Sequence, residues 1–177
     1  MSCRMDKEVA RELARPRGLV LDRRLSARAL SGLIQPSHDQ VGDATADLDG
    51  ATFAAMSAGG DPRRGAYLLA ARAADLPAGA IVLGVVDPGV GGERLPLVVE
   101  AGGRRFVGPD NGLFSRAAAR DRNARAWRID WRPARLSASF HGRDLFAPVA
   151  ARLAAGVDVP MTEFSAAQLV GSGWPDE

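Results

Sequence analysis

The amino-acid sequence predicts an α/β domain, and three observations carry this prediction. Residues 81–86 form an unbroken apolar run rich in β-branched side chains, which is typical of a strand buried on both faces. Apolar residues recur at helical spacing before this run, in residues 61–74, and after it, in residues 145–156. Between these segments, two short apolar runs joined by Gly102 and Gly103 indicate a β-hairpin.

Length and composition are those of one ordinary globular domain. The 177 residues are 46% hydrophobic, which argues against wholesale disorder. The formal net charge is only +2 and the arginines are scattered among acids, so we expect no nucleic-acid partner. Cys3 is the single cysteine, which excludes an internal disulfide and a cysteine-based metal site. No apolar run reaches the roughly 18 residues of a membrane span and no signal-peptide pattern opens the chain, so we expect a cytoplasmic protein without a membrane partner.

The hydrophobic pattern divides the chain into three parts. Residues 1–60 are poorly patterned, and residues 32–60 contain few large apolar side chains, so we interpret the latter as loop or as sequence that packs poorly. Residues 61–156 carry the regular pattern and are expected to form the α/β core. Residues 157–177 have no regular pattern and are interpreted as a tail or as the start of a linker.

The elements of the core follow from local signals. Asp61 followed by Pro62 is typical of a helix start, and we expect that helix to continue over residues 61–74. Pro77 and Gly79 then separate the helix from its neighbouring strand. The other expected elements are a central strand over residues 80–86, a hairpin of residues 95–99 and 105–107, a helix within residues 113–122, a short strand over residues 126–129, and a helix that begins after residue 141 and stops at residue 156.

Asp87 is the first candidate functional residue, because it ends the central strand immediately before a Gly-rich turn. Ligands of open α/β sheets bind outside the carboxyl ends of the strands, so a carboxylate at this point is well placed for chemistry. The alternative is that Asp87 only caps the turn through a side-chain hydrogen bond to the backbone. Structural alternatives also stay open for Arg94, as a surface partner of Glu93 or Asp87, and for His141, as an ordinary helix-start histidine.

Three segments occur in an order that resembles one known family. They are VVDPGVGGER at residues 85–94, VGPDNGLFS at residues 107–115 and SFHGRDLFAPVAA at residues 139–151. Together they resemble the S-adenosyl-L-methionine hydroxide adenosyltransferases, which are relatives of the fluorinase and chlorinase enzymes. The similarity covers residues 61–156 and implies the N-terminal α/β domain of the SAM hydroxide adenosyltransferase/fluorinase-like fold.

The resemblance also implies an activity. Members of this family cleave S-adenosylmethionine (SAM) with water to adenosine and methionine, and linked Asp, Arg and His residues activate the water. Matched motif by motif, these residues are Asp87, Arg94 and His141. The resemblance further implies a homotrimer, with SAM as the small-molecule substrate and with no metal or other cofactor. The remaining motif residues are expected to have structural roles, and they are Asp110, Asn111, Gly112, Gly142, Arg143 and Asp144.

These residue types suit the reaction. Attack at the ribose C5′ expels a neutral thioether from a sulfonium, so the leaving group needs no general acid. His141 can accept a proton near neutral pH, and Asp87 can orient either the imidazole or Arg94. The fixed positive charge of Arg94 favours hydroxide over water. Exclusion of bulk water then strengthens the attraction between hydroxide and sulfonium.

Two features of the family have no counterpart in this sequence. A TDFG-like segment, whose Asp contacts the ribose, is not found in residues 1–60, so the substrate-binding residues stay unassigned. The C-terminal β-barrel-like domain, which supplies much of the adenine site, is expected to be missing. The sequence therefore leaves two functions open: SAM hydrolysis, or a catalytically impaired or inactive fragment of such an enzyme. We expect the chain alone to hydrolyse SAM weakly or not at all.

Overall fold

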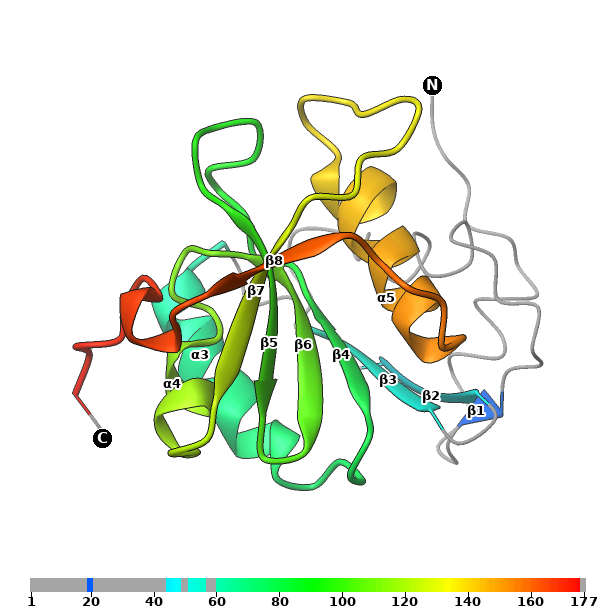
Figure 1. Cartoon of the computed structure of the whole chain (residues 1–177). Helices are drawn as coiled ribbons and strands as arrows, with labels where there is room; N and C mark the ends of the chain where they lie inside the picture. The colour runs from blue at the N-terminus through cyan, green and yellow to red at the C-terminus, as the bar shows by residue number, and fades with distance from the viewer. Residues whose placement is uncertain (1–18, 21–43, 49–50, 57–59, 176–177) are drawn as a thin grey trace.

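The computed structural model describes residues 19–20, 44–48, 51–56 and 60–175, and these residues form an α/β fold around one mixed sheet (Figure 1). The sheet has eight strands in the order β1-β2-β3-β4-β6-β5-β7-β8. The strands are β1 Leu19–Val20, β2 Ala44–Leu48, β3 Ala51–Met56, β4 Ile81–Gly84, β5 Pro96–Ala101, β6 Arg104–Pro109, β7 Arg125–Ile129 and β8 Met161–Phe164. The helices are α3 Pro62–Ala73, α4 Ser115–Ala119, the π-helix η1 Gly142–Phe146, α5 Ala147–Ala154 and the 3-10 helix η2 Ala166–Gln168.

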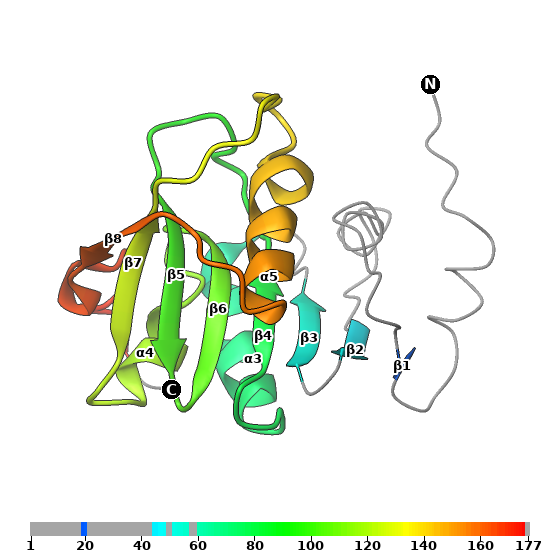
Figure 2. The ribbon, with the colours of Figure 1, turned by 45° about the vertical axis from the view of Figure 1, so that its right-hand side comes forward.

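Strand β4 lies in the middle of the sheet and is covered on both faces. It pairs in parallel with β3 on one side and with β6 on the other. Val82 packs into the core on the side of α3 and α4, whereas Ile81 and Leu83 pack against η1 and α5 on the opposite side (Figure 2). All three side chains are at most 3% exposed. The buried central strand expected over residues 80–86 is therefore confirmed, although the paired segment ends at Gly84.

Helix α3 begins where the sequence indicates. The Asp61 carboxylate accepts hydrogen bonds from the backbone N–H groups of Arg63 and Arg64, at 2.9 and 3.3 Å, which satisfies two donors that the first helical turn leaves unpaired. Leu69 is fully buried against the sheet. None of the helices in the described ranges has the length and apolar character needed to cross a membrane.

The hairpin expected around Gly102 and Gly103 is confirmed as strands β5 and β6. Both glycines have positive φ, 57° and 71°, as a two-residue hairpin turn requires. The short strand expected over residues 126–129 is confirmed as β7, which pairs with β5. Helix α4 is shorter than expected, because Leu113 and Phe114 belong to the preceding turn and bury their side chains in the core before the helix begins.

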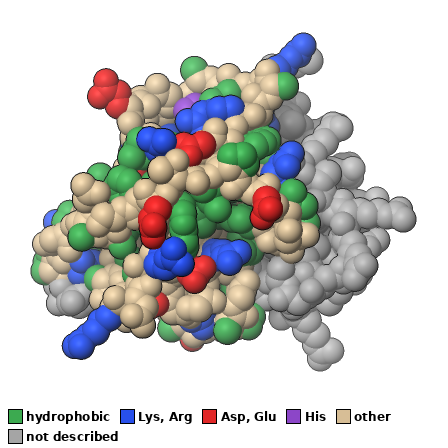
Figure 3. Space-filling model, in the orientation of Figure 1, with side chains coloured by type: hydrophobic (Ala, Val, Ile, Leu, Met, Phe, Trp, Pro, Cys, Tyr) green, Lys and Arg blue, Asp and Glu red, His purple; other side chains and the backbone are tan. Residues whose placement is uncertain are grey.

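Part of the sheet face on the α5 side is open to solvent. Beyond α5, this face carries the ion pairs Arg105–Glu100 at 3.1 Å and Arg125–Glu163 at 3.2 Å. In Figure 3, basic and acidic side chains lie beside hydrophobic ones on this side of the molecule. All four side chains are well exposed, so each pair contributes at most about 1 kcal/mol. These charges keep the uncovered strands solvated.

The sequence interpretation is wrong for two segments. The pattern of residues 32–60 indicates loop, but β2 and β3 lie there, and β3 pairs with β4. Their short side chains give no strong apolar alternation, whereas sheet pairing depends on backbone hydrogen bonds. The rest of residues 1–60, apart from β1 and residue 60, lies outside the described residues.

The pattern of residues 157–177 indicates a tail, but β8 forms an edge strand beside β7, and a half-exposed edge strand carries little hydrophobic signal.

Strands β4 and β6 approach each other closely at Gly84 and Gly108. A Cβ atom at Gly108 would lie 2.1 Å from the backbone oxygen of Gly84. We therefore expect Gly108→Ala to lower the free energy of unfolding by about 1–3 kcal/mol in urea denaturation. Gly173→Ala is the matched control, because a Cβ there meets nothing within 4 Å and should cost less than about 0.5 kcal/mol. Equal stability of the two variants would contradict this account of the strand contact.

Candidate active site

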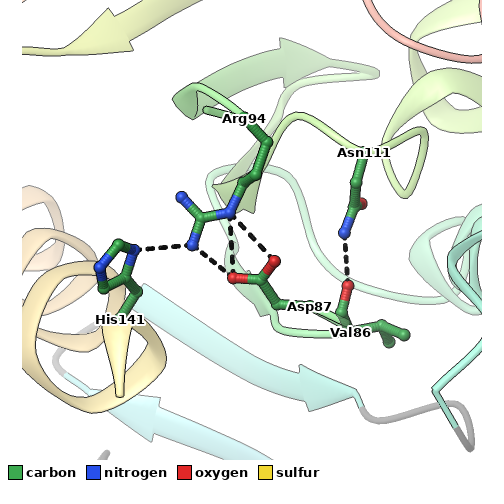
Figure 4. A network of polar contacts seen from close by, with 5 residues as sticks. All are labelled: Val86, Asp87, Arg94, Asn111 and His141. Atoms are coloured by element: carbon green, nitrogen blue, oxygen red, sulfur yellow. Dashed lines mark hydrogen bonds and ion pairs between the residues drawn. The ribbon is translucent and has the colours of Figure 1, made fainter. Parts of the chain in front are cut away.

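The structure brings Asp87, Arg94 and His141 together at the carboxyl end of β4 (Figure 4). Asp87 follows β4, Arg94 lies just before β5, and His141 is the residue at the N-terminus of η1. The loops that carry them project from the same end of the sheet in Figure 1. The three residues that the family resemblance implies are therefore linked by direct contacts through Arg94, and we refer to them below as the trio.

Asp87 and Arg94 form a nearly buried ion pair. The Arg94 Nε lies 3.0 Å from each Asp87 carboxylate oxygen, and its Nη2 also donates to Oδ2. The side chains are only 5% and 11% exposed, respectively, so Arg94 is not the surface arginine of the structural alternative. The turn after β4 is closed by the backbone oxygen of Asp87, which accepts from Val90 N at 3.2 Å, while the carboxylate serves Arg94. Removing either partner would leave a buried charge unpaired, which is strongly destabilising.

The contact between Arg94 and His141 fixes the tautomer of the imidazole. Arg94 Nη2 lies 2.8 Å from His141 Nδ1. A guanidinium has donors but no acceptor, so Nδ1 must accept, and the proton of the neutral ring must then lie on Nε2. His141 thus offers an N–H donor at Nε2, and it can take up a proton at Nδ1 only by losing the hydrogen bond from Arg94.

The surroundings favour the neutral form of this ring. Burial lowers the pKa of His141 below its ordinary value of 6.5, and the positive charge of Arg94 lowers it further, while Asp87 acts in the opposite direction with a smaller effect. At neutral pH the trio therefore contains one carboxylate, one guanidinium and one uncharged imidazole. In this state the charges of Asp87 and Arg94 compensate each other, and the Nε2–H group of His141 can donate a hydrogen bond to a small anion or to a water molecule.

A close contact between two loops brings Arg94 near His141. Gly91 has φ 79°, and a Cβ atom there would lie 2.6 Å from the backbone oxygen of Ala138. Only glycine combines this backbone conformation with so short an approach. The Gly-rich turn after Asp87 thus packs directly on the loop that leads to His141.

Residues 109–112, the PDNG motif, support the backbone next to Asp87 and are not members of the trio. Asn111 Nδ2 donates to the backbone oxygen of Val86 at 2.6 Å, and Asn111 Oδ1 accepts from Leu113 N at 3.4 Å (Figure 4). The Asp110 carboxylate accepts from Val170 N at 3.0 Å, and burial raises its pKa. Gly112 has φ 96° and lies under the Trp174 ring, where a Cβ would come within 2.2 Å.

Residues 142–144, which follow His141 in the HGRD motif, hold the backbone on both sides of His141 in place. Asp144 pairs with Arg143 at 2.6 Å and accepts from Ser137 N at 3.0 Å, so it ties η1 to the preceding loop. The hydrogen bond from Arg143 is the main reason that the pKa of Asp144 lies below its usual value. Gly142 is buried, and its backbone oxygen accepts from Ala147 N. Within the described ranges, no group of three or more His, Cys, Asp or Glu side chains could hold a metal ion.

Sequence reasoning misses two side chains of this region. Phe146 places its ring under the guanidinium of Arg94, 5.2 Å from the ring centroid to Cζ. An α-helical pattern puts Phe146 on a different face from His141, so no periodicity signal points to it. Trp174 covers Gly112 from a segment whose pattern indicates a tail, and only the tertiary structure reveals that contact.

The fold and the trio together define an α/β domain with a nearly buried ion pair and a histidine at the carboxyl end of a central strand, where open α/β sheets bind their ligands. Residues 56–163 match the family described as SAM hydroxide adenosyltransferase N-terminal domain, and the chain belongs to that family. The matched region includes the end of β3 and most of β8, so it is wider than the resemblance over residues 61–156.

Several relatives carry the name (R)-S-adenosyl-L-methionine hydrolase. The chain is 54% identical to the protein of Salinispora tropica over 101 residues, which are 55% of this chain and 38% of that protein. It is 46% identical over 109 residues to the protein of Thermus thermophilus, covering 55% of this chain and 42% of that protein. The chain thus spans well under half the length of these relatives.

Two solved structures are also similar. A conserved, uncharacterised protein from Thermotoga maritima has a TM-score of 0.56 and 29% identity, with 78% of this chain and 53% of that chain covered. A conserved hypothetical protein from Thermus thermophilus has a TM-score of 0.50 and 40% identity, with 63% of this chain and 44% of that chain covered. The similarity therefore extends to the three-dimensional arrangement of the sheet and helices.

Asn111 offers a direct test of the support behind Asp87. Asn111→Asp replaces the donor to Val86 by a carboxylate oxygen that repels the carbonyl, and we expect the free energy of unfolding to fall by about 1–3 kcal/mol. The exposed Asn123→Asp makes the same chemical change and should cost less than about 0.5 kcal/mol. Urea denaturation measures both values, and a cost at Asn111 no larger than at Asn123 would refute the supporting role.

The state of His141 can be read by ¹⁵N NMR of the ring nitrogens. We expect the Nε2–H tautomer and a pKa below 6.5, and Arg94→Ala should raise that pKa because it removes a nearby positive charge. The unfolded chain binds this proton at a higher pH than the folded chain. The free energy of unfolding should therefore decrease as the pH falls below about 6.5, and His141→Gln should remove that part of the decrease. An Nδ1–H tautomer would contradict the assigned hydrogen bond.

Proposed function

We propose that this protein hydrolyses SAM to adenosine and L-methionine, with water activated at the trio. The observation that carries the proposal is the nearly buried guanidinium of Arg94, which bridges Asp87 and His141 at the carboxyl edge of the sheet. The names of the relatives, (R)-S-adenosyl-L-methionine hydrolase, support the same substrate and reaction.

The charges of the trio suggest how the nucleophile is made. A water molecule bound beside Arg94 loses a proton to solvent more easily, because the positive charge favours hydroxide. Neutral His141 then donates from Nε2 and holds the oxygen in place. The oxygen forms a bond to C5′ while the C5′–S bond breaks, and the electron pair of that bond moves to sulfur, which leaves as the neutral thioether of methionine.

Asp87 has a positioning role in this scheme. Its carboxylate holds two nitrogens of the guanidinium, so the direction of Arg94 is fixed before substrate arrives. Because the leaving group is already neutral, we propose that the reaction needs no metal and no cofactor beyond the substrate. We also propose a cytoplasmic homotrimer, for which the support is the family resemblance. The alternative, a catalytically impaired form, concerns the unassigned substrate-binding residues and not the trio, in which Asp87 and His141 each contact Arg94.

Adenosine release from SAM by the purified protein, followed by chromatography, tests the proposal. We expect Arg94→Ala and His141→Ala each to lower kcat by about 10²–10³-fold, because each removes a preorganised interaction with the nucleophile. Arg105→Ala is the matched control, since Arg105 is an exposed arginine paired with Glu100 away from the trio and should leave the rate unchanged. Absence of SAM hydrolysis, or turnover that survives His141→Ala, would overturn the proposal.

A further inference from the structure

Phe146 is fully buried, and its ring lies against the Arg94 guanidinium of the trio. It is the last residue of η1, it is 0% exposed, and it belongs to the core cluster that η1 and α5 form with β4 and β6. Its ring centroid lies 5.2 Å from Cζ of Arg94, within the range of a cation–π contact. The ring therefore meets the guanidinium that connects Asp87 to His141.

The π-helical turn explains how Phe146 and His141 reach the same guanidinium. Phe146 is five residues after His141, and in an α-helix residues five apart point roughly 140° away from each other. In η1 the turn is wider, because Ala147 N donates to Gly142 O, a hydrogen bond between residues five apart. The imidazole and the phenyl ring can then lie on one side of the helix, and both contact Arg94.

The contacts of the guanidinium are of two kinds. Its edge carries the hydrogen bonds to Asp87 and His141, and these restrain rotation within the plane. Hydrogen bonds keep most of their strength down to angles of about 150°, so they resist a tilt of the plane less than a shift within it. An aromatic face against Cζ restrains the tilt and attracts the positive charge at a place from which water is largely excluded.

We propose that Phe146 is a positioning residue for Arg94, and that the π-helical turn of η1 is the feature that presents His141 and Phe146 to one guanidinium. The inference rests on the proposed function of the trio, but it concerns the orientation of Arg94 and can be measured without substrate. Without the ring, Arg94 should tilt away from the imidazole, and the hydrogen bond to Nδ1 should weaken.

Phe146→Leu tests this proposal against a matched control, Phe106→Leu. Phe106 is also buried, at 1% exposed, but it lies in the core cluster on the other face of the sheet. Both changes remove a ring from the core and should destabilise the protein to a similar extent. The charged groups that act on His141 are Arg94, Asp87, Arg132 and Asp144, and neither variant replaces any of them.

The readout is the pKa and tautomer of His141 by ¹⁵N NMR, with SAM turnover as a second measurement. We expect Phe146→Leu to raise the pKa of His141 toward 6.5 and to lower kcat about tenfold with little change in KM, while Phe106→Leu changes neither. An unchanged pKa and tautomer in Phe146→Leu would overturn the proposal, whatever the turnover. If the wild type shows no turnover, the proposed function fails, and the NMR comparison still decides the role of Phe146.

A second variant at this position keeps the test decisive if Phe146→Leu does not fold. Phe146→Met keeps an unbranched apolar side chain that fills irregular space but lacks the aromatic face. If Phe146→Leu does not fold, the same rise in the pKa of His141 is expected in Phe146→Met. A wild-type pKa in that folded variant would overturn the proposal equally.

Discussion

The buried positive charge of Arg94 is the constraint on which the site depends. Taking a guanidinium out of water costs several kcal/mol unless its donors are satisfied and its charge is balanced. Asp87 supplies the balance, His141 accepts a further hydrogen bond, and Phe146 covers a face. Asp87 and Arg94 lie in the single loop between β4 and β5, whereas His141 and Phe146 lie at the start and the end of η1, so two separate segments of the chain must meet at one point.

The central strands of the sheet hold the backbone next to the site rigidly in place. Strand β4 is buried on both faces, and its close approach to β6 at Gly84 and Gly108 leaves little room for movement where it ends. Asn111 then holds the carbonyl just before Asp87. A carboxylate supported in this way holds the guanidinium in one direction, which is the preorganisation that the proposed reaction requires.

The uncharged state of His141 shapes the proposed chemistry. The hydrogen bond from Arg94 and the burial of the ring both oppose protonation, so the imidazole serves better as a donor to a bound oxygen than as a base. Two cationic groups side by side would repel each other at this depth. A neutral ring next to Arg94 avoids that repulsion and fits the hydrogen-bond donor role that we propose for His141.

The sequence by itself determined the buried strand at β4, the helix capped by Asp61, the hairpin at Gly102 and, through three ordered motifs, the trio. The strand, the helix and the hairpin follow from local periodicity and turn chemistry, which short segments carry alone, whereas the trio follows from the resemblance of the three motifs to a known family. Strands β2, β3 and β8 escape sequence reasoning, because backbone pairing with a neighbour places them in the sheet and their side chains show little alternation. Only the tertiary structure decided the tautomer of His141 and the contact of Phe146 with Arg94, because both depend on where a charge from a distant segment comes to lie and on a π-helical turn that α-helical periodicity does not anticipate.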